Sequence, residues 1–155
     1  MPFFYIKMNI EEYKNIIEPI VNRNNCIVWG IEILRGKKRT TLRVFIDSSE
    51  DVNINDCENV SKDLNYEPML DATLGEDYIL EVSTPGVDRK FFNIDQLNDY
   101  IGMELEFKTR ELIQGKRKFS GILSECNDSY FSIKNRNEPN IMKFKFSDID
   151  LCKLK

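Results

Sequence analysis

The stretch that decides the fold is EVSTPGVDR, residues 81–89. It continues an apolar segment in which Tyr78, Leu80 and Val82 alternate with other residues, which is the pattern of a β-strand. The strand should end at the turn residues Pro85 and Gly86, because proline fixes φ and glycine tolerates positive φ. The sequence therefore predicts a strand, a tight turn and then an Asp-Arg pair.

A helix is expected near the beginning of the chain. Asn9 and Glu12 have the spacing of a capping box, in which both side chains bind free backbone amides of the first turn. Pro19 should kink this helix or end it after about two turns, because an interior proline lacks an amide donor. The helical spacing predicts one apolar stripe, formed by Tyr13, Ile16, Ile17, Ile20 and Val21.

Two strands and a second helix should separate this helix from the decisive stretch. Residues 26–36 and 40–49 alternate as strands do, and the basic turn 35–39 joins them as a hairpin. Asn53 should cap the second helix. The order α-β-β-α-β predicts a two-layer α+β domain, residues 1–89, with a topology like that of KH domains. The glycine spacing GxxG of KH domains does not occur in the sequence.

A different pattern begins after Arg89. Residues 94–101 suggest a short helix or turn, and strict alternation over 103–110 predicts a strand. Several more short strands follow at close spacing, which favours a small closed β-barrel of the SH3 or Sm type over residues 90–155. Gly121 should allow one barrel strand to bend sharply.

The charges are distributed unevenly. Residues 1–90 contain 11 basic and 16 acidic side chains, whereas residues 91–155 contain 11 and 10. A net charge of −4 argues against non-specific coating of nucleic acid, which requires a basic field. Local basic positions are candidate RNA contacts or, alternatively, solvated surface: Arg35, Lys37, Lys38, Arg39, Lys116, Arg117, Lys118, Lys143 and Lys145.

Several classes of function are disfavoured by composition. The absence of histidine excludes Ser-His-Asp and Cys-His catalysis. No cofactor or metal is expected, because the four cysteines are far apart in the sequence. We expect a cytoplasmic protein without membrane association, because no apolar run approaches about 18 residues and the opening lacks the pattern of a secretory signal.

Three motifs resemble the RimP family of ribosome maturation factors. They are LRVFID at 42–47, DCENVS at 56–61 and LEVSTPGVDR at 80–89, and the second half resembles the Sm-like C-terminal barrel of that family. The resemblance implies a non-enzymatic, monomeric assembly factor that binds the immature small (30S) ribosomal subunit. Its implied partners are a small-subunit ribosomal protein of the decoding region and small-subunit rRNA. Abundant Asn, Lys and Ile suggest an AT-rich bacterial source.

Two other functions stay open. One is an Sm-like RNA-binding regulatory protein that forms a ring, and the other is an enzyme that uses Asp47, Glu81 and Asp88. The candidate residues for an interdomain joint or a ribosome contact are Asp47, Ser83, Pro85, Gly86, Asp88 and Arg89. The Asp-Arg pair is expected either to fix the angle between the domains or to contact the ribosome directly.

Overall fold

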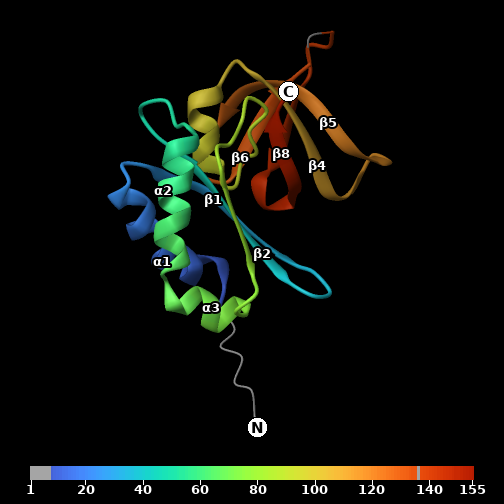
Figure 1. Cartoon of the computed structure of the whole chain (residues 1–155). Coiled ribbons are helices and arrows are strands. Elements are labelled where there is room, and N and C mark those ends of the chain that lie inside the picture. The colour runs from blue at the N-terminus through green and yellow to red at the C-terminus, as the bar shows by residue number, and fades with distance from the viewer. Residues whose placement is uncertain (1–7, 136) are drawn as a thin grey trace. The chain divides into compact units, whose positions relative to one another are not determined.

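The computed structural model describes residues 8–135 and 137–155, and its elements fall into two units (Figure 1). The first unit ends at Pro85 and the second begins at Gly86. The predicted boundary between residues 89 and 90 lies four residues further on and stays a prediction. Most of the opening segment considered for a secretory signal, residues 1–7, lies outside the described residues. None of the helices in the described part is long and apolar enough to span a membrane.

Helix α1, Ile10–Arg23, begins at the predicted capping box. The Asn9 side chain accepts a hydrogen bond from the Glu12 amide at 2.9 Å, and the Asn9 amide donates to the Glu12 carboxylate at 3.3 Å. Pro19 does not end the helix, so the expectation of only about two turns is wrong. Ile20 and Val21, which follow the proline, are buried in the core, and their packing compensates for the missing amide donor.

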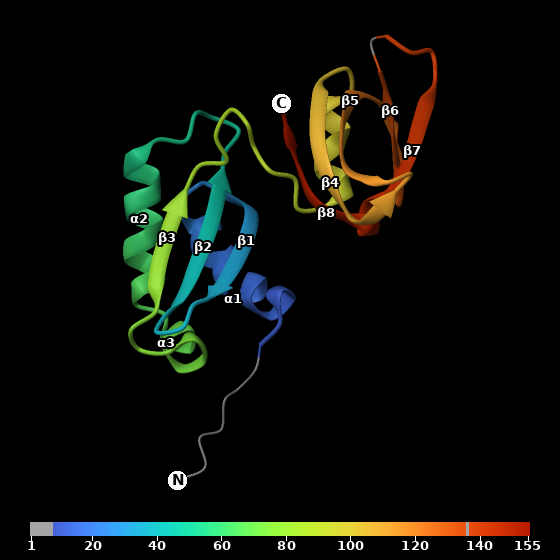
Figure 2. The same ribbon diagram turned by 90° about the vertical axis from the view of Figure 1, so that its right-hand side faces the viewer.

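The first sheet has the strand order β1-β2-β3, with bounds Ile27–Arg35, Thr40–Asp47 and Ile79–Ser83. Strands β1 and β2 form the predicted antiparallel hairpin, whereas β2 and β3 are parallel. A parallel pair needs a long connection, which here contains α2, Ile54–Asn65. Figure 2 shows the three strands side by side, and α1 and α2 pack on this sheet through contacts with β1 and β3.

A short helix, α3, Pro68–Leu74, was not predicted from the sequence. Glu67 accepts a hydrogen bond from the Met69 amide at 3.3 Å, and Pro68 occupies the first helical turn. Leu70 and Leu74 point into the core. Seven residues are too few to show a clear helical period, so only the proline and the cap mark this helix in the sequence.

Apolar side chains of the helices and of one sheet face form the core of the first unit. Leu42, Val44 and Ile46 on β2 are fully buried. On β1, Val28 pairs with Ile46 but Gly30 pairs with Phe45, which leaves residue 29 as an extra residue in a β-bulge. The bulge reverses the alternation. Ile27 consequently lies 55% exposed although it shares the predicted phase of the later apolar residues.

The second unit has an antiparallel sheet with the order β7-β6-β5-β4-β8 (Figure 2). Its strands are β4 Glu104–Ile113, β5 Lys116–Cys126, β6 Tyr130–Lys134, β7 Ile141–Lys145 and β8 Ile149–Leu154. Two 3-10 helices, η1 Ile94–Tyr100 and η2 Phe146–Asp148, accompany the sheet. Element α1 to β3 and this five-stranded sheet together make an α+β protein.

The expected closed barrel is not found. Within the described residues, β7 and β8 are the two edges of the sheet and do not pair with one another. Strand β6 pairs with residues 122–126 of β5, so residues 116–120 have β4 as their only strand neighbour. Alternation predicts strands but not which edges meet, and this is why the sequence could not exclude an open sheet.

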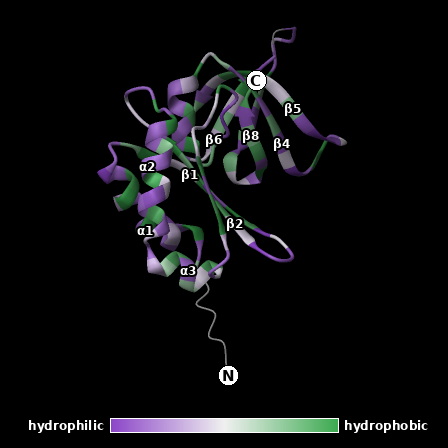
Figure 3. Ribbon diagram, viewed as in Figure 1, coloured by the Kyte–Doolittle hydropathy of each residue, from purple (hydrophilic) through white to green (hydrophobic). Residues whose placement is uncertain are grey.

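Aromatic side chains fill the core of the second unit. Phe107, Phe119, Phe131 and Phe144 are buried, and neighbouring ring centroids lie 4.8–5.9 Å apart. Gly121 allows β5 and β6 to approach closely, because a β-carbon there would lie 3.1 Å from the Ile133 side chain. Figure 3 shows hydrophobic residues along the strands of each unit and hydrophilic residues in the loop between β1 and β2.

Candidate functional site

The candidate residues Asp47 and Ser83 lie at the same end of the first sheet. Strands β2 and β3 are parallel, with Phe45 paired to Ser83, so their carboxyl ends share one edge. The Asp47 carboxylate accepts a hydrogen bond from the Ser48 amide at 2.9 Å. Pro85 follows immediately after β3. The structure therefore brings the end of the LRVFID motif and the start of the Pro-Gly turn to one edge.

The turn after β3 leads into the second unit. Gly86 has φ of +80°, a conformation that favours glycine, and Val87 is 95% exposed. The Arg89 guanidinium lies 5.6 Å from the centroid of the Tyr100 ring, and the Arg89 carbonyl accepts a hydrogen bond from the Leu154 amide at 3.0 Å. Arg89 is thus anchored within the second unit, whereas Asp88 is exposed.

The basic turn between β1 and β2 is fully solvent-facing. Gly36 closes it by donating its amide to the Arg39 carbonyl at 2.9 Å. Arg35, Lys37, Lys38 and Arg39 are all exposed, as a contact finger requires. The Arg39 Nε lies 4.0 Å from a carboxylate oxygen of Asp77, which is a weak surface pair.

The residues of the enzyme hypothesis have separate environments. Arg43 donates its Nε–H to Glu81 at 2.7 Å, and its Nη1 lies 3.8 Å from the Glu32 carboxylate. The hydrogen bond to Glu81 raises the pKa of Arg43 further. Asp47 lies four residues beyond Arg43 on β2, or about 13 Å along the strand. Glu81 is therefore engaged in a cross-strand ion pair away from Asp47.

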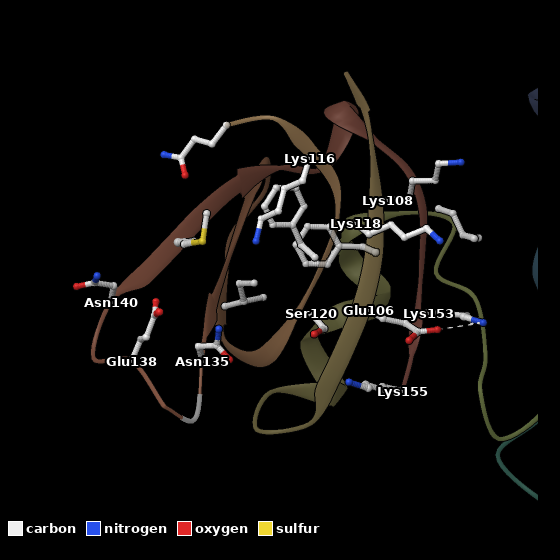
Figure 4. Close-up of a pocket in the computed structure, with 16 residues that line it drawn as sticks. Glu106, Lys108, Lys116, Lys118, Ser120, Asn135, Glu138, Asn140, Lys153 and Lys155 are labelled. Carbon is white, nitrogen blue, oxygen red and sulfur yellow. Dashed lines mark ion pairs between the residues drawn. The ribbon is translucent and has the colours of Figure 1, made fainter. Parts of the chain in front are cut away.

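A groove with a volume of about 720 Å³ lies on the second unit (Figure 4). It extends along the part of β5 that has no β6 neighbour, so that the open strand edge borders it. Five lysines and two glutamates line it, which leaves an excess of positive charge: Lys108, Lys116, Lys118, Lys153, Lys155, Glu106 and Glu138. Amide and hydroxyl side chains are also present: Gln114, Ser120, Asn135 and Asn140.

The lysines of this lysine groove differ in their partners. Lys153 Nζ lies 3.1 Å from a Glu106 oxygen, which Figure 4 marks as an ion pair, and Lys155 Nζ lies 3.6 Å from Glu104. Lys108 and Lys118 are directly opposite each other on β4 and β5. Among the described residues, neither has a carboxylate oxygen within 4.0 Å.

Of the basic residues predicted on β5, two line the lysine groove and one does not. Lys116 Nζ lies 4.9 Å from the centroid of the Phe119 ring, and Lys118 faces Lys108. Arg117 donates its Nε–H to the Thr109 carbonyl at 3.0 Å and has Nη2 4.0 Å from Asp150. Its contacts therefore stabilise the sheet. The sequence analysis missed Lys108, because an outward lysine in an alternating strand carries no local signal of its partner.

The cysteines are free thiols with different exposure. Cys26 and Cys152 are buried, and burial raises the pKa of Cys152 to about 12, so that this thiol stays protonated at neutral pH. Cys57 and Cys126 are partly exposed. No group of three or more metal-ligating side chains occurs within residues 8–135 and 137–155.

Comparison with known families identifies the first unit. Residues 16–88 match the family model of the RimP N-terminal domain, a range that runs from α1 through the Pro-Gly turn. RimP proteins are ribosome maturation factors, so this match defines the class of protein that the fold and the 81–89 stretch indicate. The chain accordingly resembles the RimP family, as its three sequence motifs predicted.

Proposed function

We propose that this protein is a maturation factor of the small (30S) ribosomal subunit. It binds the immature subunit, contacts the ribosomal protein of the decoding region, and leaves when assembly is complete. The observation that carries the proposal is the RimP N-terminal domain match over residues 16–88. The factor acts by binding energy, because a protein that prefers one arrangement of its partner increases the population of that arrangement.

The charge of the first half supports a protein partner there. Residues 1–90 have 16 acidic against 11 basic side chains. Ribosomal proteins are basic as a class, and complementary charge accelerates association and disfavours wrong partners. The edge that carries Asp47 and Ser83 is the proposed contact, and the turn with Pro85, Gly86 and Asp88 extends it toward Arg89.

Finer features of the fold belong to the same proposal. The order α1-β1-β2-α2-β3 is compatible with a KH-like topology, with α3 as an addition. A KH-like unit without a GxxG loop would not clamp phosphates in the KH manner, which again favours a protein partner for the first unit. We propose that residues 1–89 and 90–155 act as two domains with separate binding surfaces.

Fractionation of a cell lysate on a sucrose gradient tests the proposal. An antibody against the protein should detect it with free small subunits and not with translating ribosomes. Detection only at the top of the gradient, even at low salt, would overturn the proposal. The Arg89→Ala variant should reduce comigration while both units stay folded, because Arg89 joins the turn to the Tyr100 ring.

The ring-forming RNA regulator and the enzyme predict different results. A ring elutes from a sizing column as a hexamer or heptamer, whereas a RimP-like factor elutes as a monomer. An enzyme would show metal-dependent activity on nucleotides or RNA that Asp88→Ala abolishes. Elution as a monomer without such activity is the expected outcome.

A further inference from the structure

We propose that the lysine groove of the second unit binds the sugar-phosphate backbone of RNA, independently of base sequence. This inference rests on the proposed function, which supplies ribosomal RNA as the source of the ligand. It assigns that contact to Lys108, Lys118 and Lys116, three lysines brought together on the first half of β5 and the facing part of β4.

The first argument is the like-charged pair at the centre of the sheet. Lys108 and Lys118 occupy directly opposed positions, where side chains are about 5 Å apart at their β-carbons. Like charges placed in this way destabilise a sheet. Such a pair is expected where an anionic ligand supplies the missing negative charge.

The second argument is the contrast with the other cations of the same sheet. Lys153, Lys155 and Arg117 all lie within 4.0 Å of a carboxylate oxygen. The sheet therefore provides acidic partners for cations that need none from outside. Lys108 and Lys118 lack such a partner within the described part of the chain.

The third argument is the shape and chemistry of the groove. Figure 4 shows Lys116 toward the side bordered by Asn135, Glu138 and Asn140, with Lys108 and Lys118 on the other side. A chain of phosphates could thus meet ammonium groups at successive points along about 720 Å³ of open groove. Amide and hydroxyl groups such as Asn140 and Ser120 can bind phosphate and sugar oxygens.

The ligand class follows from what the groove lacks as well as from its charge. The rings of Phe107 and Phe119, which border it, are buried in the core and are not available for stacking on bases. Phosphate contacts give affinity and position but carry no sequence information. An RNA backbone is therefore favoured over a base-specific site, and the excess of lysine disfavours a basic ribosomal protein at this groove.

Fluorescence anisotropy with the purified full-length chain tests the inference. The probe is a fluorescein-labelled oligouridylate of about 12 nucleotides, titrated at several KCl concentrations. The test variant is Lys108→Gln/Lys118→Gln, which keeps the aliphatic stems and removes both charges. The matched control is Lys62→Gln/Lys145→Gln, which removes two exposed lysines that do not line the groove. Thermal melting verifies that both variants are folded.

The groove variant should bind the probe at least tenfold more weakly than the wild-type chain. The slope of log K against log salt should become shallower by about 2, one for each lost phosphate contact. Lys108→Arg/Lys118→Arg should retain binding, and oligoadenylate should bind about as well as oligouridylate. The control should stay within twofold of wild type.

The inference is overturned if the groove variant and the wild type bind alike, if both double variants lose affinity equally, or if the wild type does not bind at low salt. These results leave the proposed function standing as long as the wild-type chain comigrates with small subunits. Conversely, RNA binding through the groove without comigration would contradict the proposed function and not this inference.

Discussion

The two sheets treat cross-strand charge in opposite ways. In the first sheet, Arg43 on the central strand has Glu32 and Glu81 as its neighbours in the register on either side, and it contacts both carboxylates. In the second sheet, Lys108 faces Lys118. The first row satisfies its own charges and needs no partner, whereas the second has positive charge in excess.

This difference separates structural from functional charge. An alternating strand places every second side chain outward, so a lysine or arginine there carries no meaning by itself. Its neighbour across the strand gives it one. The complementary row stabilises the first sheet, and the like-charged row is retained, in our account, because a polyanion binds there.

The largest expected effect concerns whether the two units also fold separately. Phe131 and Leu64 are fully buried, one in each unit, and truncation of either to alanine should cost about 3–5 kcal/mol of unfolding free energy. The single tryptophan, Trp29, reports on the first unit in a urea titration. Leu64→Ala should shift its transition strongly and Phe131→Ala only weakly. Equal shifts would show that the chain unfolds as one cooperative body.

A smaller effect is expected from the complementary row. Arg43→Met keeps an apolar stem but leaves two carboxylates without their cation. We expect a loss of about 1 kcal/mol, because the pair is partly solvent-exposed and screening limits its worth. Urea denaturation at low and high salt measures this loss. Arg43→Lys should recover only part of it, since lysine cannot reproduce the Nε–H bond to Glu81.

The smallest effect has the opposite sign. Lys118→Gln should stabilise the free protein by a few tenths of a kcal/mol, because it removes the repulsion from Lys108. The gain should fade as salt is added, since exposed charges are screened beyond about 10 Å at 0.1 M. Thermal melting without phosphate measures it. Destabilisation at low salt would show that the two lysines are not in the repulsive arrangement described.

Most elements could be predicted from the sequence because their signals are local. The capping boxes at Asn9 and Asn53 and the alternating strands fix where elements begin. The β-bulge at residue 29, the persistence of α1 past Pro19 and the open second sheet depend on tertiary packing. No single-residue pattern encodes such packing.

The candidate site was only half accessible to sequence reasoning. Lys116 and Lys118 stood out as part of a basic run, but Arg117 between them is held by Thr109 and Asp150. Lys108 was found only through its register with Lys118. Pairing across strands joins residues ten positions apart, and the sequence does not reveal it because the turn geometry sets the register.

Binding of the purified chain to purified small subunits tests the central claim most directly. Immature small subunits from cells depleted of the protein and mature small subunits are each mixed with it and centrifuged through a sucrose cushion. The account predicts that the protein pellets with immature subunits in clear excess over mature ones. Recovery of the protein in the supernatant with both kinds of subunit, at low salt, would contradict it.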